Sequence, residues 1–145
     1  MTNQTQKEKF NNRVYGCAII KSINSNYNAD FTHQPRTLPD GIVYATDKAL
    51  KYTIKHYFAK NFPAEKIFYW KRLNREMNPL AINETFDNIF GKAPDKNNKI
   101  NVLLDLLQCL DIRLFGATYA DKSNKINISI HGPVQISHGI NRYPK

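Results

Sequence analysis

Three lysines, Lys48, Lys51 and Lys55, recur at three- and four-residue spacing within residues 45–58, ATDKALKYTIKHYF. This spacing places them on one face of a helix. A row of ammonium groups suits the phosphates of a single nucleic acid strand, and a helix N-terminus, here with Thr46 as predicted N-cap, adds backbone amides that bind phosphate. The alternative is a solvated polar face, which any surface helix needs.

A long polar stretch, Ser22 to Gly41, precedes this helix, and connections of this length within a compact domain are usually functional or disordered. Its Asn24, Ser25, Asn26 and Asn28 side chains suit phosphate and ribose hydroxyls, although the same residue types also form tight turns. Arg36 offers a planar guanidinium fork for phosphate. Its alternative role is a surface ion pair with Asp40 or Asp47.

A third polar segment, GPVQISHGINRY, covers residues 132–143. It displays Gln135, Ser137, His138, Asn141, Arg142 and Tyr143. These are hydrogen-bonding groups together with an aromatic ring on which a base can stack. The alternative is a structural turn in which His138 caps a carbonyl.

The sequence RLFGA places Arg113 and Gly116 in a predicted turn. Gly116 is expected to permit a close approach of two backbones, and Phe115 is expected in the core.

Signals for catalysis are few. His33, His56, His131 and His138 lack the spacing of a metal site, and the hydrolase, phosphate-loop and zinc-protease motifs are absent from the sequence. Asp30 and His33 share the polar loop and could support metal-assisted RNA cleavage, but no positioned partners are evident. We therefore predict no catalytic residues, no metal and no cofactor.

The hydrophobic content and the charge of the sequence are typical of a globular protein that binds a polyanion. The 145 residues are 41% hydrophobic, and 21 Lys and Arg against 12 Asp and Glu give a net charge of +9. Cys17 and Cys109 are predicted to be buried free thiols of a cytosolic protein. No apolar stretch in the sequence reaches the ~20 residues that span a bilayer, so a cytoplasmic location is expected.

The predicted order of elements is strand, long loop, helix, a mainly helical middle and strand. Residues 1–12 form a polar lead-in, Arg13 to Lys21 reads as a buried strand, and residues 66–70 as a short strand or part of a second helix. A helix is predicted from Pro79 to Gly91, an exposed loop over 92–99 and an apolar helix over 100–110. Ile126, Ile128 and Ile130 alternate with polar residues in a half-buried strand.

Four segments in this order carry a family resemblance: INSNYNADF, PRTLPDGIVYATDKALKYTIKHY, DIRLFGATYA and GPVQISHGINRY. Together they resemble the Cascade backbone subunit of type I CRISPR systems, the Cas-seven family in its type I-B (Csh) form. The resemblance covers about Arg13 to Tyr143.

The resemblance implies an α+β fold with an RRM-like (ferredoxin-like) palm, here one domain over 1–145, with a mainly helical insertion at 61–110. It implies a non-enzymatic subunit that binds the CRISPR guide RNA, polymerises with copies of itself, joins other Cascade subunits and meets target DNA through the guide. The implied RNA-binding residues are Asn24, Asn26, Arg36, Thr46, Lys48, Lys51, Lys55, Arg113, Gln135, Ser137, His138 and Arg142.

Two alternatives accompany this interpretation. Related type III backbone subunits cleave RNA with a loop aspartate, for which Asp30 is the nearest candidate. Family members also continue past the GPVQ segment, whereas this sequence stops at NRYPK, so an N-terminal portion or a shortened homologue is expected. Such a chain would have an incomplete palm and could interfere with the assembly of intact subunits.

Overall fold

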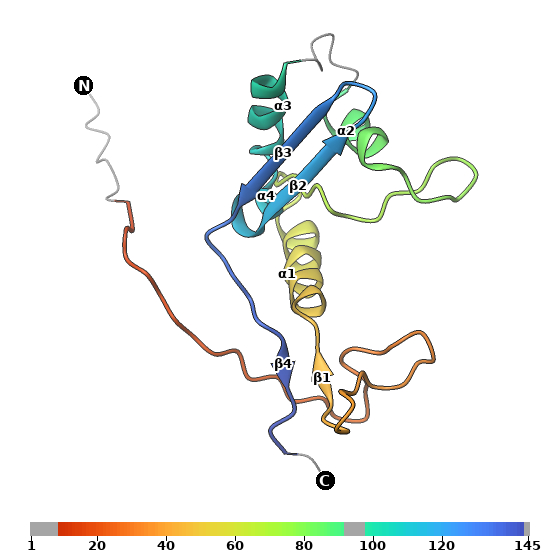
Figure 1. Cartoon of the computed structure of the whole chain (residues 1–145), viewed down its shortest axis with the longest axis vertical. Helices are drawn as coiled ribbons and strands as arrows, with labels where there is room; N and C mark the ends of the chain where they lie inside the picture. Colours follow the sequence, from red (N-terminus) through yellow and green to blue (C-terminus); the bar gives the residue numbers. More distant parts are fainter. Residues whose placement is uncertain (1–8, 92–97, 144–145) are drawn as a thin grey trace.

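The computed structural model describes residues 9–91 and 98–143. Most of the predicted lead-in and of the predicted loop at 92–99 lies outside these residues. The elements in chain order are β1 (Tyr44–Ala45), α1 (Asp47–Asn61), α2 (Ile82–Phe90), α3 (Lys99–Leu106), α4 (Leu110–Phe115), β2 (Gly116–Asp121), β3 (Ile126–His131) and β4 (Gly139–Ile140). Figure 1 shows α1 running from the body formed by α2–α4 and the β2–β3 hairpin to the β1–β4 pair.

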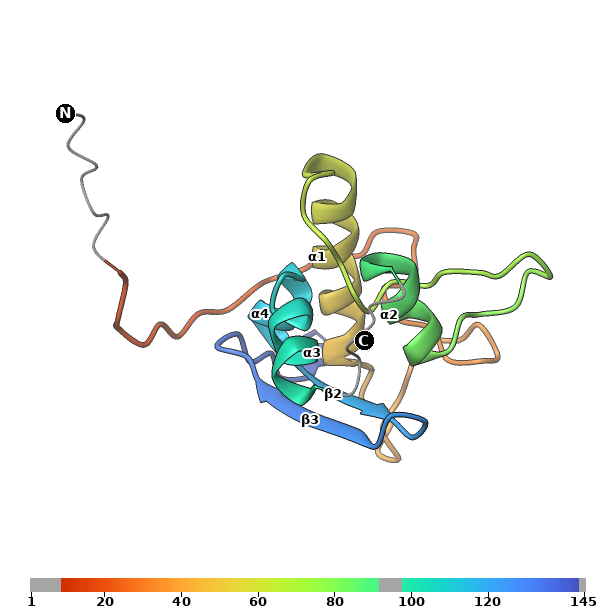
Figure 2. The same cartoon turned by 90° about the horizontal axis from the view of Figure 1, so that it is seen from above.

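The core lies between the β2–β3 hairpin and three short helices. The strands pair antiparallel, with Tyr119 opposite Ile128, and their inward side chains are almost fully buried. Helices α2, α3 and α4 cover one face of the hairpin (Figure 2), where Phe86, Leu106 and Ile112 complete the core. The alternation predicted for β3 is confirmed, since Ile126 and Ile128 are buried and the residues that follow each of them, Asn127 and Ser129, are exposed.

A buried carboxylate attaches residues 66–70 to this core. Asp111, at the start of α4, accepts hydrogen bonds from the backbone N–H groups of Phe68 and Tyr69, both at 2.8 Å. The Leu110 N–H donates to the Lys66 carbonyl, and Lys66 forms an isolated parallel bridge with Cys109. The segment is therefore an anchored irregular stretch, neither the strand nor the helix that its sequence suggested.

Helix boundaries differ from the predictions at two places. Helix α2 ends at Gly91 as expected but begins at Ile82 rather than Pro79, because the Glu84 carboxylate accepts a hydrogen bond from the Ala81 N–H there. The apolar helix predicted over 100–110 is broken before Cys109, and α4 then runs to Phe115. Arg113 therefore lies in a helix and not in the predicted turn.

Gly116, which starts β2, has the predicted close contact. It has a φ of +79°, and a Cβ at this position would lie 2.2 Å from the Ile130 carbonyl oxygen. Only glycine fits a site with both a left-handed backbone and no room for a side chain.

The prediction of a buried N-terminal strand is wrong. Arg13 to Lys21 is extended but exposed, with Ile19 at 93% exposure, and Cys17 is exposed rather than buried. A strand requires a hydrogen-bonded neighbour, and no described segment pairs with these residues. Figure 1 shows the segment running outside the rest of the molecule.

The predicted α+β class is confirmed by the four helices and small antiparallel sheets of the described residues. The RRM-like arrangement is not seen in residues 9–91 and 98–143, whose strands form two separate two-stranded sheets, β1–β4 and β2–β3. The range 61–110 contains α2 and α3, and its assignment as an insertion stays a prediction.

Candidate nucleic-acid interface

The polar loop before α1 folds back on itself. Ala29 and Pro35 form one isolated antiparallel bridge, and Thr37 and Val43 form another. Inside the first bridge, Asp30 Oδ1 accepts hydrogen bonds from Thr32 N, Thr32 Oγ1 and Gln34 N at 2.8, 2.7 and 3.1 Å. The Thr32 hydroxyl is the main cause that lowers the pKa of Asp30, so this carboxylate is an acceptor within a turn.

Strand β1 joins this loop to α1. The Tyr44 N–H donates to the Arg36 carbonyl at 2.9 Å, and the Arg36 N–H donates to the Asn28 carbonyl at 3.2 Å. The Asn28 side-chain oxygen accepts from both the N–H and the hydroxyl of Thr46, at 2.9 and 3.1 Å. Thr46 is the N-cap residue, as predicted, but its side chain makes no capping bond.

The C-terminal segment reaches the same place. Strand β4 pairs antiparallel with β1, and the His138 ring stacks on Tyr44 with centroids 6.0 Å apart. His138 Nε2 lies 3.7 Å from the Asp47 carboxylate, so His138 meets a side chain rather than capping a carbonyl. We call the five residues gathered here, Asn28, Arg36, Tyr44, Thr46 and His138, the β1 cluster.

Two buried polar atoms of this region have no hydrogen-bond partner among the described residues, Arg36 Nε and the Tyr27 hydroxyl. No ion pair from Arg36 to Asp40 or Asp47 occurs within the described part of the chain. A buried donor without a partner costs about 1–3 kcal/mol. These donors are suited to an oxygen-rich ligand that supplies the acceptor.

The three predicted lysines of α1 do not form a free cationic row. Lys48 is exposed, but Lys51 Nζ pairs with Asp47 at 2.8 Å and lies 5.6 Å from the centre of the Phe115 ring. Lys55 Nζ donates to the Tyr69 carbonyl at 2.7 Å. Partial burial lowers the pKa of Lys55.

The remaining predicted residues lie at separate places. Arg113 pairs with Glu65 at 3.1 Å and donates to carbonyls that precede α4. Gln135 donates to the Gly132 carbonyl at 2.7 Å, just beyond β3. Asn26 donates to the His33 carbonyl at 3.3 Å within the polar loop. Asn24, Ser137 and Arg142 are exposed. The structure thus brings Arg36, Thr46 and His138 together, with Lys48 close by in the chain, and does not gather the others around them.

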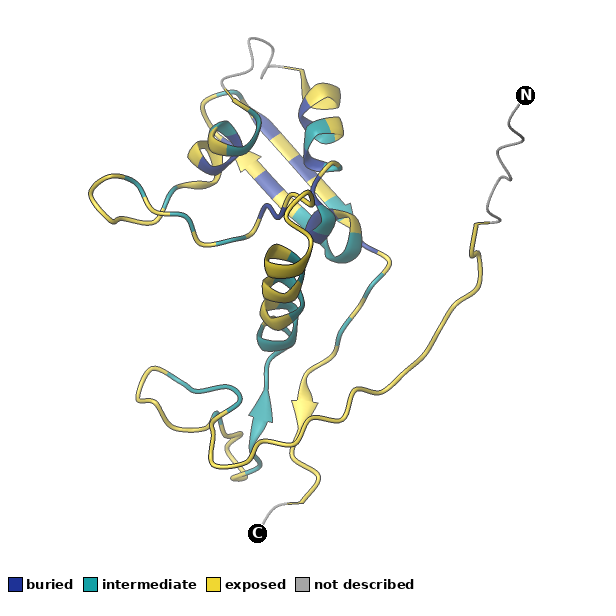
Figure 3. Ribbon diagram, turned by 180° about the vertical axis from the view of Figure 1, so that it is seen from behind, coloured by how far each residue is buried: buried dark blue, intermediate teal, exposed yellow. Residues whose placement is uncertain are grey.

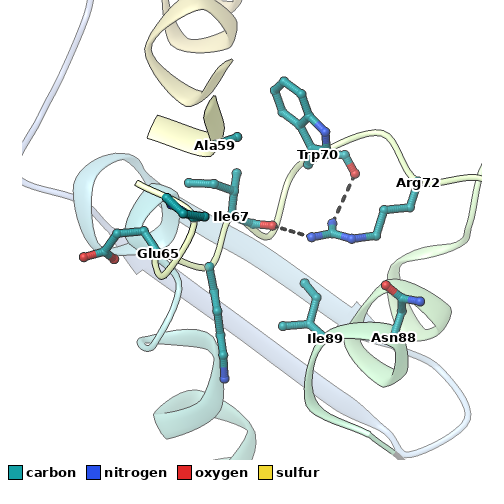
Figure 4. A pocket seen from close by; sticks show the side chains of 9 residues that line it. Ala59, Glu65, Ile67, Trp70, Arg72, Asn88 and Ile89 are labelled. Carbon is teal, nitrogen blue, oxygen red and sulfur yellow. Dashed lines mark hydrogen bonds between the residues drawn. The ribbon is translucent and has the colours of Figure 1, made fainter. Parts of the chain in front are cut away.

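An aromatic stack that was not predicted from the sequence lies further along α1. The rings of Tyr52 and Trp70 are 5.4 Å apart and 9° from parallel, and His56 lies 5.8 Å from Trp70 at 20°. Beside Trp70 is a pocket of about 300 Å³ whose walls include Arg72 and Asn88 (Figure 4). The four-residue spacing of Tyr52 and His56 was the available signal, since it places both rings on one helix face.

Residues 9–91 and 98–143 contain no group of three or more His, Cys, Asp or Glu side chains that could hold a metal ion. The predicted absence of a metal and of a cofactor stays a prediction. Within the same residues, none of the helices combines the length and the apolar character that crossing a bilayer requires.

Comparison with models of protein families shows the family to which the chain belongs. The family model described as CRISPR-associated protein Cas7 matches residues 12–145, nearly the whole chain. The chain belongs to the Cas7 family. Membership makes it a CRISPR-associated protein of the family whose members are backbone subunits that bind CRISPR RNA. No curated protein and no protein of known structure matches this Cas7 chain.

Proposed function

We propose that this chain is a guide-RNA-binding backbone subunit of a Cascade-type surveillance complex in antiviral defence, of the type I-B form. The single observation that carries the proposal is the Cas7 family match over residues 12–145. In this role the subunit holds the backbone of the guide, and base pairing between guide and target DNA reads the sequence. Its partners would be the guide RNA, copies of itself and other Cascade subunits in the cytoplasm, and its palm would be RRM-like.

The β1 cluster is the part of the proposed RNA surface with the most support. It gathers residues from the polar loop, the start of α1 and the C-terminal segment. Arg36 Nε has no hydrogen-bond partner among the described residues, Lys48 is exposed nearby in the chain, and the whole chain carries a net charge of +9. Phosphate oxygens would satisfy the arginine, and the excess positive charge favours a polyanion.

We further propose that the chain is not an RNase. A metal-dependent cleavage site at Asp30 needs a carboxylate that is available to an ion or a water molecule. Asp30 Oδ1 already accepts three hydrogen bonds within its own turn, which favours a structural role. If the proposal is right, the purified chain incubated with Mg²⁺ leaves labelled RNA intact, and Asp30→Ala changes nothing. Cleavage that Asp30→Ala abolishes would contradict it.

Salt-dependent binding tests the RNA contact. We expect the chain to bind labelled single-stranded RNA, with an affinity that falls linearly with salt on a log–log plot. Lys48→Gln or Arg36→Gln should each reduce the slope by about 0.7, the value for one lost phosphate contact to a single strand. Fluorescence anisotropy between about 50 and 200 mM salt measures the slope.

The matched control is Lys122→Gln. Lys122 is exposed in the turn between β2 and β3, at the opposite end of the molecule from the β1–β4 pair (Figure 1). The control makes the same change in net charge, so it should leave the slope within error of the unsubstituted chain. An equal loss for all three substitutions would mean that only total charge matters, and an absence of RNA binding would refute the proposed function.

A further inference from the structure

A row of four exposed side chains follows one face of α1. Lys48, Tyr52, His56 and Lys60 are spaced four residues apart, so each lies about one turn beyond the last. The row spans about 18 Å from its first to its last Cα. It carries a cation at each end and two rings between them. No residue of α1 is buried, and Figure 3 shows the helix mostly in the colour of exposed residues.

The indole of Trp70 packs on the middle of this row. Its ring is near-parallel to both Tyr52 and His56, and those two rings are themselves 6.2 Å apart at 11°. Tyr52 remains 58% exposed although it belongs to the stack. The three near-parallel rings are therefore held together with Tyr52 and His56 exposed and Trp70 partly buried.

The backbone around Trp70 is fixed, so the stack is preorganised. The Trp70 N–H donates to the Phe68 carbonyl at 2.8 Å, and Lys55 Nζ donates to the Tyr69 carbonyl at 2.7 Å. Arg72 reaches back from the other side, and its Nη1 donates to the Trp70 carbonyl at 3.3 Å (Figure 4). A ring that is already ordered loses little conformational entropy when a ligand stacks on it.

The surrounding charge indicates the class of ligand. Residues 48–72 contain seven Lys and Arg and a single acidic residue, Glu65. A ligand that is both planar and anionic fits this combination, and an unpaired nucleic acid strand has both properties because every base has a π-face beside a phosphate. A second copy docked face to face would instead bring the lysines of the two rows together, which like charges disfavour.

We propose that Tyr52, His56 and Trp70 form a stacking platform for the bases of an unpaired RNA strand, with Lys48 and Lys60 contacting the phosphates on either side. This inference rests on the proposed RNA binding and adds a base-contacting site to it. It predicts that binding depends on the bases of the RNA as well as on its backbone.

The single tryptophan of the chain gives a direct readout, because all tryptophan fluorescence comes from Trp70. We expect single-stranded RNA to quench this emission as it binds, with the midpoint given by the anisotropy of the labelled RNA. An abasic ribose-phosphate strand of equal length should bind more weakly and leave the emission unchanged, because it has no base to stack.

Paired substitutions distinguish a loss of RNA affinity caused by removing the platform from one caused by removing any exposed aromatic side chain. Tyr52→Ala should weaken RNA binding about tenfold, the size expected when one base loses its aromatic partner, whereas Tyr52→Phe should restore it. Tyr57→Ala is the matched control, since Tyr57 is on the same helix, is 56% exposed and packs against Phe58 and Phe62 outside the stack. Circular dichroism checks that each variant keeps its helices.

The outcomes distinguish the platform from the proposed function. Quenching together with a selective loss in Tyr52→Ala supports the platform. If RNA binds without quenching, and Tyr52→Ala and Tyr57→Ala bind it with equal affinity, the platform is overturned and the proposed function stands. If no RNA binds, both are overturned. Trp70 emission could also shift with protein concentration in the absence of RNA. If Tyr52→Ala removed that shift, the stack would be a contact between copies of the chain, and the platform would be overturned.

Discussion

Replacement of Asp111 by alanine should loosen the attachment of residues 66–70 to the core. The Asp111 carboxylate is 2% exposed and accepts the N–H groups of two consecutive residues, Phe68 and Tyr69, at 2.8 Å each. Alanine at this position leaves both donors without a partner. The segment that carries Trp70 would then lose its main polar contact with α4.

The size of the effect follows from the number and burial of these bonds. A hydrogen bond to a charged group contributes about 1.5–3 kcal/mol, so two fully buried bonds are worth about 3–6 kcal/mol. Phe68 is 1% exposed, but Tyr69 is 37% exposed, so water can reach part of the second site. We expect Asp111→Ala to lower the free energy of unfolding by about 4 kcal/mol.

Urea unfolding followed by circular dichroism and by Trp70 emission measures this loss. Asp111→Asn keeps one carbonyl oxygen and should cost about half as much. Asp105→Ala is the control, because within the described residues the Asp105 carboxylate accepts one side-chain hydrogen bond, from Gln108 at 3.1 Å, and the variant should stay within about 0.5–1 kcal/mol of the unsubstituted chain. Asp111→Ala and Asp105→Ala with equal midpoints would refute the reasoning.

Three further outcomes are expected. Gly116→Ala should destabilise the fold at least twice as much as Gly41→Ala in thermal unfolding; both glycines have positive φ, which costs about 1–2 kcal/mol for alanine, but only Gly116 has backbone within 3 Å of the added Cβ. Burial raises the pKa of Cys109 to about 12, so a thiol reagent at neutral pH should label only the other cysteine, which is exposed, until denaturant is added. The Ser123 hydroxyl is the main cause that lowers the pKa of Asp121 below its usual 3.8. The resulting stability is present above that usual pKa and is lost as the pH falls through the lowered one, so Asp121→Asn should flatten the stability curve below about pH 4.

Local pattern was a good guide where neighbours in sequence decide the structure. The alternation of Ile126 and Ile128 predicted β3, and Thr46 and Asp47 marked the start of α1. Gly116 was correctly expected to permit a close backbone contact. For β3 and α1 the relevant interaction lies within one element, and for Gly116 it is with the paired strand of the same hairpin.

Prediction failed where distant partners decide. Arg13 to Lys21 has the composition of a strand, but pairing depends on a second strand, which the described residues do not provide. Lys55 looked like a solvated cation because its partner, the Tyr69 carbonyl, lies outside α1. The contact of Asn28 with Thr46 crosses 18 residues, and no local pattern indicates it.

The β1–β4 pair has a consequence for the order in which the chain folds. It joins Tyr44 to Ile140, so the chain between them must close into one long loop before the pair can form. Closing a loop of this length costs about 4 kcal/mol, and only two residue pairs offset that cost. We therefore expect β1 and β4 to associate after the hairpin and its helices have folded, and to separate first, so that amide exchange is faster at Ala45 than at Tyr119. A ligand that contacts both strands would then stabilise their pairing, and with it the arrangement of the β1 cluster.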